Sequence, residues 1–292
     1  MSTAVPNPRH ATLEDLRAEI DAIDESLHDL LMRRAGLAAA IARLKNGKKG
    51  ADAATFFRPA REAAVLRRLL SRHEGPFPTA SLVQIWREMM GALLRLQGPF
   101  AVAVGVDAPD GAPLKELVRD HFGTGTRIRA LLSSVGAVRA VAVGRATVAV
   151  VPYPAPERRI PRHSWWLSLA QRGAPRVVAA LPALARRYDP AALAVAKTVP
   201  EPTGRDRSLA VLRAREVLSS QRIAGYLNRS GIDGRVCDRA SAGRAVLLEI
   251  EGFVEPDSDV LDGMRAEFGL GAEALTVIGT FPVPPIFDGA AT

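Results

Sequence analysis

The first hundred residues carry a hydrophobic pattern of helical period. Between Leu13 and Lys45, two series of residues recur at intervals of seven and fall on one side of an α-helix. The members of the two series are Leu13, Ile20, Leu27, Arg34 and Ile41, and Leu16, Ile23, Leu30, Leu37 and Leu44. The pattern predicts one long helix with an apolar stripe, which the glycine- and lysine-rich segment 46–50 ends.

Arg34 places a positive charge inside this apolar stripe. A guanidinium cannot become neutral by losing a proton, so an apolar site is costly for it unless an anion is close. The position therefore predicts either a bound anion or a buried ion pair with Glu62. Lys45 follows about 16 Å further along the same helical face and could hold the other side of a small dianion. Arg17 lies about 25 Å before Arg34 on a different face, so it would reach the same ligand only from a second copy of the chain.

Two shorter helices are predicted after this one. Thr12 and Asp15 form a capping pattern at the start of the first helix, and Pro59 suits the first turn of the second. Glu62 shares the apolar face of the second helix, and Gln97 continues the apolar face of a third that begins near Thr79. We therefore expect an all-helical region over residues 10–98.

Beyond residue 99 the pattern changes to short apolar runs alternating with helical segments, which is typical of an α/β region. Strands are expected at 101–106, 141–143 and 147–151, and helices at 113–122, 133–140, around Trp165-Trp166, and at 181–187. From residue 205 to 285 the predicted order is strand 208–212, helix 215–229, strands 235–238 and 245–250, helix 257–268 and strand 275–278. This βαββαβ order predicts two helices packed on one antiparallel sheet.

Composition narrows the function classes. The 292 residues carry a net charge of +8 without a long lysine or arginine block. This charge favours an anionic small ligand or no specific partner, and we expect no nucleic acid. Cys237 is the one cysteine, and no stretch approaches the length of a membrane span, so we expect a cytoplasmic protein without a membrane partner. The five histidines have no metal-ligand spacing and the glycines form no phosphate loop, so we expect no metal and no cofactor.

Residues 13–97 resemble the AroQ-type, all-helical chorismate mutases, which form an intertwined helical dimer and are often fused to prephenate dehydratase. The matching segments are Leu16-Arg17, Leu30-Leu31-Met32-Arg33-Arg34, Lys45, Arg61-Glu62, and Ile85-Trp86-Arg87-Glu88-Met89-Met90 with Gln97. Arg58 stands where the family often has an acidic residue, and Leu93 where a serine is common.

The resemblance implies a role for each of these side chains. Arg17 would cross the dimer to one substrate carboxylate, and Arg34 would hold the other. Lys45 and Gln97 would contact the ether oxygen, and Glu62 the ring hydroxyl. Arg61 and Arg58 would complete the substrate-binding set. Such a site rearranges chorismate to prephenate by holding one conformer and placing positive charge at the breaking ether bond.

Residues 100–285 resemble, more faintly, a prephenate dehydratase domain (99–204, truncated) followed by an ACT domain (205–285). The signature motifs are replaced by residues 105–111, by 153–157, and by Asp206-Arg207-Ser208 where the dehydratases carry Thr-Arg-Phe. Residues 238–241 replace a phenylalanine-binding stretch of the ACT domain. We therefore expect a dehydratase-like region without catalysis, with Ser208 as the one candidate substitute for the threonine.

The sequence thus predicts a chorismate mutase of aromatic amino acid biosynthesis that is a homodimer through its N-terminal helices. Further self-association through the ACT-like part is expected. A bifunctional chorismate mutase/prephenate dehydratase is the first alternative. A non-catalytic regulator of the same pathway is the second.

Overall fold

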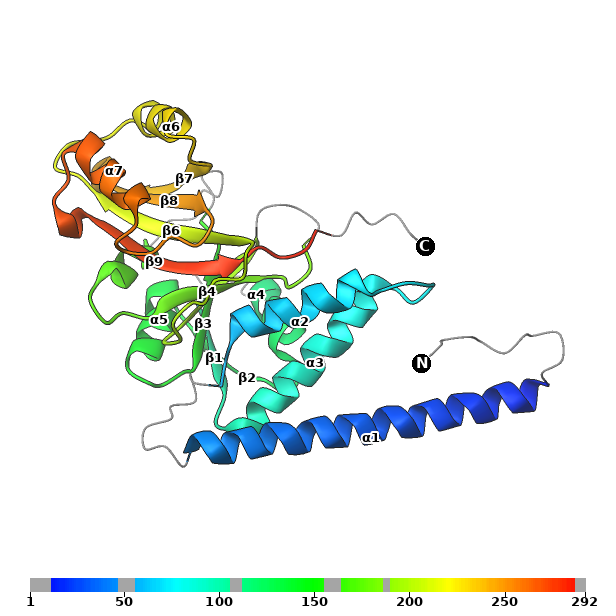
Figure 1. Ribbon diagram of the computed structural model, residues 1–292. Helices are drawn as coiled ribbons and strands as arrows, with labels where there is room; N and C mark the ends of the chain where they lie inside the picture. The colour runs from blue at the N-terminus through cyan, green and yellow to red at the C-terminus, as the bar shows by residue number, and fades with distance from the viewer. Residues whose placement is uncertain (1–11, 47–55, 106–111, 155–163, 186–189, 287–292) are drawn as a thin grey trace. The chain divides into compact units, whose positions relative to one another are not determined.

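The computed structural model describes residues 12–46, 56–105, 112–154, 164–185 and 190–286. The chain divides into two compact units, residues 1–50 and residues 51–292 (Figure 1).

The first unit is one helix, α1 (Leu13–Asn46), as the heptad pattern predicts. Its start is a reciprocal cap: the backbone N–H of Asp15 donates to the Thr12 hydroxyl (3.2 Å), and the backbone N–H of Thr12 donates to the Asp15 carboxylate (2.9 Å). The Thr12 hydroxyl also donates to that carboxylate, and this bond lowers the pKa of Asp15. The cap explains why the helix begins at Leu13.

The apolar stripe of α1 is exposed in the single chain. Eight of its side chains have between 49% and 76% of their surface open. They are Leu13, Ile20, Ile23, Leu27, Leu30, Leu37, Ile41 and Leu44. A contiguous apolar surface of this extent marks an interaction site rather than a solvated face.

The second unit begins with a helical hairpin, α2 (Pro59–Ser71) and α3 (Thr79–Gln97), at the predicted positions. Gly91 lets α3 approach the end of the next helix, α4 (Ala112–Phe122), because a Cβ at Gly91 would lie 1.9 Å from the carbonyl oxygen of Phe122. Phe57, Phe100 and Phe122 are buried together, with ring centroids 5.6 to 6.1 Å apart. The hairpin therefore packs directly against the α/β part of the chain.

A sheet fills the rest of this unit. Its first five strands are β1 (Ala101–Gly105), β2 (Arg127–Leu131), β3 (Val148–Pro152), β4 (Arg176–Leu181) and β5 (Ala192–Ala196). Strand β1 is parallel to β2 and β3, and β5 is antiparallel to β3 and β4. Helix α5 (Ser134–Ala142) and the short 3-10 helix η2 (Trp165–Ala170) connect these strands along with α4.

The last segment has the predicted βαββαβ order. Its elements are β6 (Asp206–Arg213), α6 (Ser220–Arg229), β7 (Gly234–Ala240), η3 (Ser241–Gly243), β8 (Ala245–Glu251), α7 (Asp259–Phe268), η4 (Ala272–Ala274) and β9 (Leu275–Pro282). The pairs β6–β8, β6–β9 and β7–β8 are antiparallel, as expected. Strand β9 also pairs with β4, so that within the described residues nine strands form one sheet, in the order β2-β1-β3-β5-β4-β9-β6-β8-β7.

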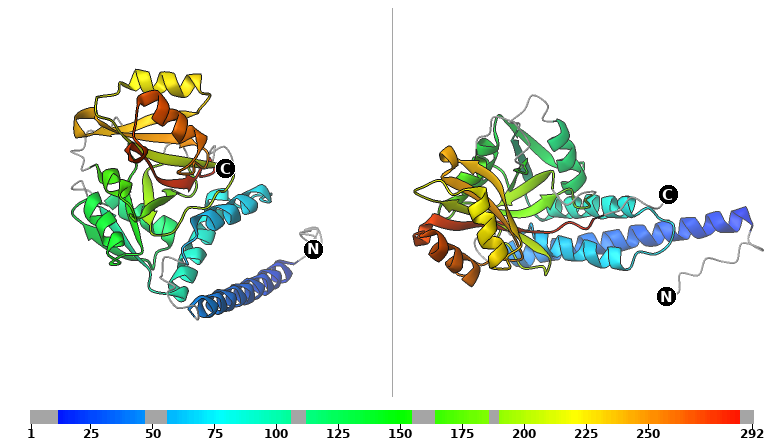
Figure 2. Two further views of the ribbon diagram at one scale, coloured as in Figure 1. Left: turned by 60° about the vertical axis from the view of Figure 1, so that its left-hand side comes forward. Right: turned by 90° about the horizontal axis from the view of Figure 1, so that it is seen from above.

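Strands β6 and β8 are apolar on both faces because both faces are covered. Leu209 and Val211 of β6 belong to a core shared with α5 and η2, whereas Ala210 and Leu212 belong to a second core shared with α6 and α7. Figures 1 and 2 show α6 and α7 together over strands β6–β9. The alternation of the side chains thus accounts for two hydrophobic layers.

Several predicted elements were wrong. Residues 141–142 end α5 instead of forming a strand, since the Ser133 hydroxyl accepts the N–H of Gly136 and starts a helix that continues through them. Residue 181 ends a strand rather than starting a helix, and strands β2, β4 and β5 were not predicted. Helix α6 begins at Ser220, capped by Ser219, rather than at residue 215. The predicted helix end at 47–50, most of the replaced motif 105–111, and residues 155–157 lie outside the described residues.

Candidate functional site

The three cations predicted on the first helix all lie on α1. Arg17 is exposed, whereas Arg34 and Lys45 are half-buried. The helix is continuous from Leu13 to Asn46, so the spacing of about 16 Å between Arg34 and Lys45 holds as expected. Arg34 belongs to the same side of the helix as the exposed apolar stripe.

In the second unit, Glu62 of α2 forms an ion pair with Arg87 of α3. Nη1 of Arg87 lies 2.8 Å from Oε2 of Glu62, and the two side chains are only 3% and 13% exposed. Nε of Arg87 also donates to the backbone carbonyl of His121 (2.6 Å). Moving either side chain out of such a buried pair would leave the other charge uncompensated. The pair therefore holds both side chains in place. One alternative from the sequence is an ion pair of Glu62 with Arg34, whereas in the structure Arg87 pairs with this carboxylate.

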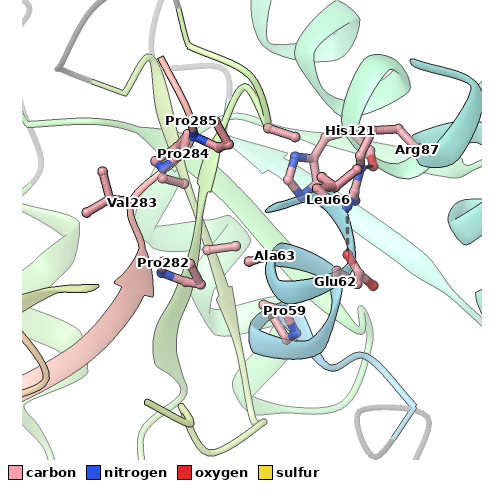
Figure 3. A pocket seen from close by; sticks show the side chains of 13 residues that line it. Pro59, Glu62, Ala63, Leu66, Arg87, His121, Pro282, Val283, Pro284 and Pro285 are labelled. Atoms are coloured by element: carbon pink, nitrogen blue, oxygen red, sulfur yellow. Dashed lines mark hydrogen bonds and ion pairs between the residues drawn. The ribbon is translucent and has the colours of Figure 1, made fainter. Parts of the chain in front are cut away.

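A cavity of about 40 Å³ lies beside this pair. Glu62, Arg87 and His121 line one side of it, and the segment Pro282–Pro285 lies opposite (Figure 3). The volume has room for about three water molecules and is too small for a ring-bearing substrate. The site that Glu62 would contribute to is therefore not this cavity.

His121 lines the cavity in its neutral form. Its side chain is buried, and burial, followed by the charge of Arg87, lowers its pKa well below the usual value of 6.5. Its Nδ1 has no hydrogen-bond partner among the described residues. The ring packs edge-on against Phe122, with the centroids 4.7 Å apart. Protonation at this position would place a second positive charge beside Arg87.

The other predicted site residues of this unit are not part of the ion pair. Gln97 is ten residues beyond Arg87, about 15 Å along α3, and its amide donates to the carbonyl of Leu93 (3.0 Å). Arg58 is exposed, and its Nη2 contacts both oxygens of Glu201 (2.8 and 3.0 Å). Arg61 is exposed in the first turn of α2.

Two residues of this arrangement were not identified as site residues from the sequence. Arg87 could have been identified from its spacing, because Val83, Arg87, Met90 and Leu94 recur at intervals of four, three and four. In the structure all four side chains are buried. This is the same signal that identified Arg34. His121 lies at the end of an amphipathic helix and gives no comparable signal, since only the packing of α3 on α4 buries it.

Ser208, the candidate substitute for a catalytic threonine, is buried in β6 with three partners. Its hydroxyl donates to the carbonyl of Gly252 (2.8 Å), contacts the Thr280 hydroxyl (2.9 Å) and accepts from the N–H of Val254 (2.9 Å). One hydroxyl has one proton and two lone pairs, so these contacts use its whole hydrogen-bonding capacity. The Ser208 hydroxyl thus links β6 to β9 and to the turn after β8.

A buried charged cluster occupies the other face of the same strands. The Tyr153 hydroxyl donates to Glu249, whose second oxygen lies 3.3 Å from Nε of Arg235 and 3.9 Å from Nη1 of Arg207. Burial, and then the neighbouring Cys237 and Glu249, raise the pKa of Tyr153, so that its hydroxyl keeps its proton. The cluster joins β3 to strands β6, β7 and β8.

In the segment 238–241, Asp238 and Arg239 both have structural partners. The carboxylate of Asp238 accepts from the indole N–H of Trp166 (3.0 Å), and Arg239 donates to the carbonyl of Leu218 (2.7 Å) and the hydroxyl of Ser220 (3.0 Å). The segment thus ties β7 to η2 and to the start of α6.

Within the part of the chain that the structure describes, no group of three or more His, Cys, Asp or Glu side chains is placed to hold a metal ion. No helix in that part has both the length and the apolar composition needed to cross a membrane.

Comparison with known proteins finds a family match for the N-terminal part of the chain. Residues 16–98 match the model of the family chorismate mutase type II. This match confirms that the N-terminal part of the chain resembles the chorismate mutases.

Two curated relatives are named as chorismate mutases with a second activity. The bifunctional chorismate mutase/prephenate dehydratase of Stutzerimonas stutzeri is 33% identical over 141 residues, which are 48% of this chain and 38% of that protein. The protein of the same name from Neisseria gonorrhoeae is 36% identical over 107 residues, 37% of this chain and 27% of that protein. The matches thus span less than two fifths of the length of these relatives.

Among solved structures, a prephenate dehydratase from Streptococcus mutans aligns with 64% of this chain and 100% of its own length. The TM-score is 0.45 and the sequence identity is 12%.

Proposed function

We propose that this protein is a chorismate mutase, an isomerase that converts chorismate to prephenate in aromatic amino acid biosynthesis. The observation that carries the proposal is the match of residues 16–98 to the chorismate mutase type II family. The reaction is an intramolecular rearrangement that needs no nucleophile, metal or cofactor. Its requirements are a fixed substrate conformer and positive charge at the breaking ether bond.

The active form is a homodimer through α1. The exposed apolar stripe supports this assembly, because each large apolar side chain that a partner fully covers contributes about 1.5 to 3 kcal/mol. A second copy of the chain also explains how Arg17 could reach the ligand held by Arg34. That residue lies too far from Arg34 along α1 to share one small ligand within a chain, whereas an antiparallel partner helix brings the partner's Arg17 towards Arg34.

Arg34 and the partner's Arg17 hold the two substrate carboxylates in this proposal. Guanidinium groups suit the role because their planar donor pairs match a carboxylate, and because they stay charged when water is excluded. Lys45 and Gln97 donate to the ether oxygen, which gains negative charge as its bond to the ring breaks. This differential contact stabilises the transition state more than the bound substrate.

Glu62 accepts the ring hydroxyl. One oxygen of its carboxylate holds Arg87, and the other keeps lone pairs for a hydroxyl donor. Arg87 acts as a positioning residue, since it fixes the carboxylate without touching the substrate. Arg61 supports substrate binding from the start of α2, whereas Arg58 would have to leave Glu201 to do so.

We further propose the division into a helical mutase domain (10–98), a truncated dehydratase-like region (99–204) and an ACT-like domain (205–285). The last two are structural or regulatory rather than catalytic, and the ACT-like domain is a second surface for self-association. The three protein contacts of Ser208 support this view, since they leave its hydroxyl no capacity for acid–base work. The bifunctional names of the curated relatives keep dehydration as the alternative to test.

One assay separates these activities. The purified protein is given chorismate, its loss is followed by absorbance, and phenylpyruvate is measured after prephenate has accumulated. Consumption of chorismate without enzyme-dependent phenylpyruvate is the expected result. Enzyme-dependent phenylpyruvate would establish the bifunctional alternative. Unchanged chorismate would overturn the mutase assignment and favour a non-catalytic regulator.

A further inference from the structure

A second, larger cavity lies at the sheet edge where β1, β2 and β3 begin. Its volume is about 400 Å³, within the range of small-molecule sites. Its lining residues are Pro99, Phe100, Ala101, Arg127, Arg129, Val141, Gly144, Arg145, Ala146, Thr147 and Lys197. Four of these residues are cations and none is acidic.

The sheet topology brings the four cations together from three parts of the chain. Arg127 and Arg129 are two residues apart on the edge strand β2, so their side chains leave the same face. Arg145 belongs to the turn between α5 and β3. Lys197 follows β5 directly, and the antiparallel pairing of Ala196 with Val148 returns it to the start of β3.

The four positive charges are not neutralised by ion pairs with any carboxylate in the part of the chain that the structure describes. All four side chains are exposed. Like charges on one concavity repel each other, so a negatively charged ligand is favoured there by every one of them. The C-terminus of α5 contributes about half a negative charge to the wall, which four full positive charges outweigh.

The floor of the cavity is apolar. Phe100, Val141 and Ala146 are each less than a tenth exposed. The Thr147 hydroxyl is engaged by the backbone of β1, since it accepts from the N–H of Ala101 (3.3 Å). A ligand would therefore meet carbon at the base and cations at the rim, which suits an organic anion better than a bare inorganic ion.

We propose that this cavity binds a small organic dianion, with its carboxylate or phosphate groups on Arg127, Arg129, Arg145 and Lys197 and its apolar body against Phe100 and Val141. None of these residues belongs to the proposed mutase site. The inference therefore goes beyond the proposed function and does not depend on it.

Isothermal titration of the 292-residue chain tests the proposal with three probes: isophthalate, phenyl phosphate and the neutral analogue isophthalamide. One or both dianions should bind saturably and more weakly as salt rises, and isophthalamide should not bind. Binding of only one dianion identifies the carboxylate or the phosphate as the preferred group. The double variant Arg129→Gln/Arg145→Gln should weaken the binding by about tenfold or more, because two charge-assisted contacts are lost.

Two control variants locate the binding. Arg172→Gln removes an exposed arginine outside the cavity and should leave the affinity unchanged. Arg34→Ala should also leave it unchanged, which separates this cavity from the mutase site. Circular dichroism verifies that each variant is folded, and the single variant Arg145→Gln replaces the double one if that variant unfolds.

Three results would overturn the proposal. The first is the absence of binding by both dianions at millimolar concentration. The second is equal affinity in the wild type and in the folded Arg129→Gln/Arg145→Gln or Arg145→Gln variant. The third is tighter binding of a duplex oligonucleotide than of either dianion, which would identify the four cations as part of a nucleic-acid surface.

Discussion

Arg34 and Arg87 show how an arginine among apolar positions can be interpreted. Both recur with leucine, isoleucine, valine or methionine at helical spacing. Arg87 is satisfied within the chain by Glu62 and by a backbone carbonyl. Arg34 lies on a stripe whose apolar members are exposed, which is the arrangement expected where a partner and a ligand complete the surroundings.

Replacing Arg34 by alanine should lower kcat/KM for chorismate by about a hundredfold or more, because the contact of a desolvated charge pair is worth about 2 to 5 kcal/mol. Arg33→Ala, the neighbouring exposed arginine, is the matched control and should retain activity. Steady-state kinetics give the ratio, and circular dichroism checks that α1 remains helical. Near-normal turnover of Arg34→Ala would make Arg34 a structural residue.

His121 should make the second unit less stable in mild acid. Its pKa is depressed in the folded protein, so below about pH 6.5 the unfolded chain binds a proton that the folded chain does not. The free energy of unfolding should therefore fall as the pH is lowered, by up to about 1.4 kcal/mol per pH unit. His121→Gln should reduce this slope.

Urea unfolding between about pH 7 and pH 5 measures the slope. The control is His28→Gln, which removes a histidine whose side chain is 69% exposed and should leave the slope as in the wild type. Equal slopes in the wild type and His121→Gln would show that His121 is protonated equally in the folded and unfolded chains.

At the scale of elements, the sequence predicted the helices better than the strands. Helices α1, α2 and α3 repeat their apolar residues over many turns, and the cap of Thr12 agrees with that period. Strand β2 reads Arg-Ile-Arg-Ala-Leu and lies at the sheet edge, so it has no apolar run. Strand β5 reads Ala-Leu-Ala-Val-Ala, a composition that also suits a helix, and becomes a strand through pairing with β3 and β4.

The same limit applies to the sites. The cations of α1 were predicted from the sequence because their spacing lies within one helix. The contact of Glu62 with Arg87, the burial of His121 and the cavity of Arg127, Arg129, Arg145 and Lys197 each depend on segments that are distant in sequence. Local patterns cannot specify such pairs, since they arise from the order of the strands and the packing of α3 on α4.

The contact of α3 with α4 depends on Gly91. Gly91→Ala should destabilise the second unit by about 1 to 3 kcal/mol, because its methyl group would overlap the carbonyl of Phe122 and force the helices apart. Gly225→Ala in α6 is the matched control, since its Cβ would meet only the end of the Arg229 side chain at 3.4 Å. That variant should gain up to about 1 kcal/mol from helix propensity.

Thermal or urea unfolding of the two variants gives both values. Equal stability of Gly91→Ala and the wild type would contradict the close approach of α3 to α4.

At the scale of the whole molecule, the proposed site belongs to two chains. An Arg17→Ala protein mixed with an Arg34→Ala protein should regain about a quarter of the wild-type activity. Random exchange makes about half of the dimers mixed, and each mixed dimer has one intact site of its two. The activity of the mixture is compared with that of each variant alone.

Native mass spectrometry establishes whether subunits have exchanged. Exchange without a gain in activity would show that Arg17 does not serve the partner's site.

Strand β9 has a consequence for the synthesis of the protein. Among the described residues it is the last strand in chain order, yet it lies near the middle of the sheet, between β4 and β6. Until residues 275–282 leave the ribosome, β4 and β6 each have one edge without a partner strand. Both strands are rich in apolar residues, and unpaired edges of this kind favour association with other chains. The nascent chain therefore depends on β9 to join the two halves of the sheet, and the stage of synthesis before β9 emerges is where we expect chaperone binding to concentrate.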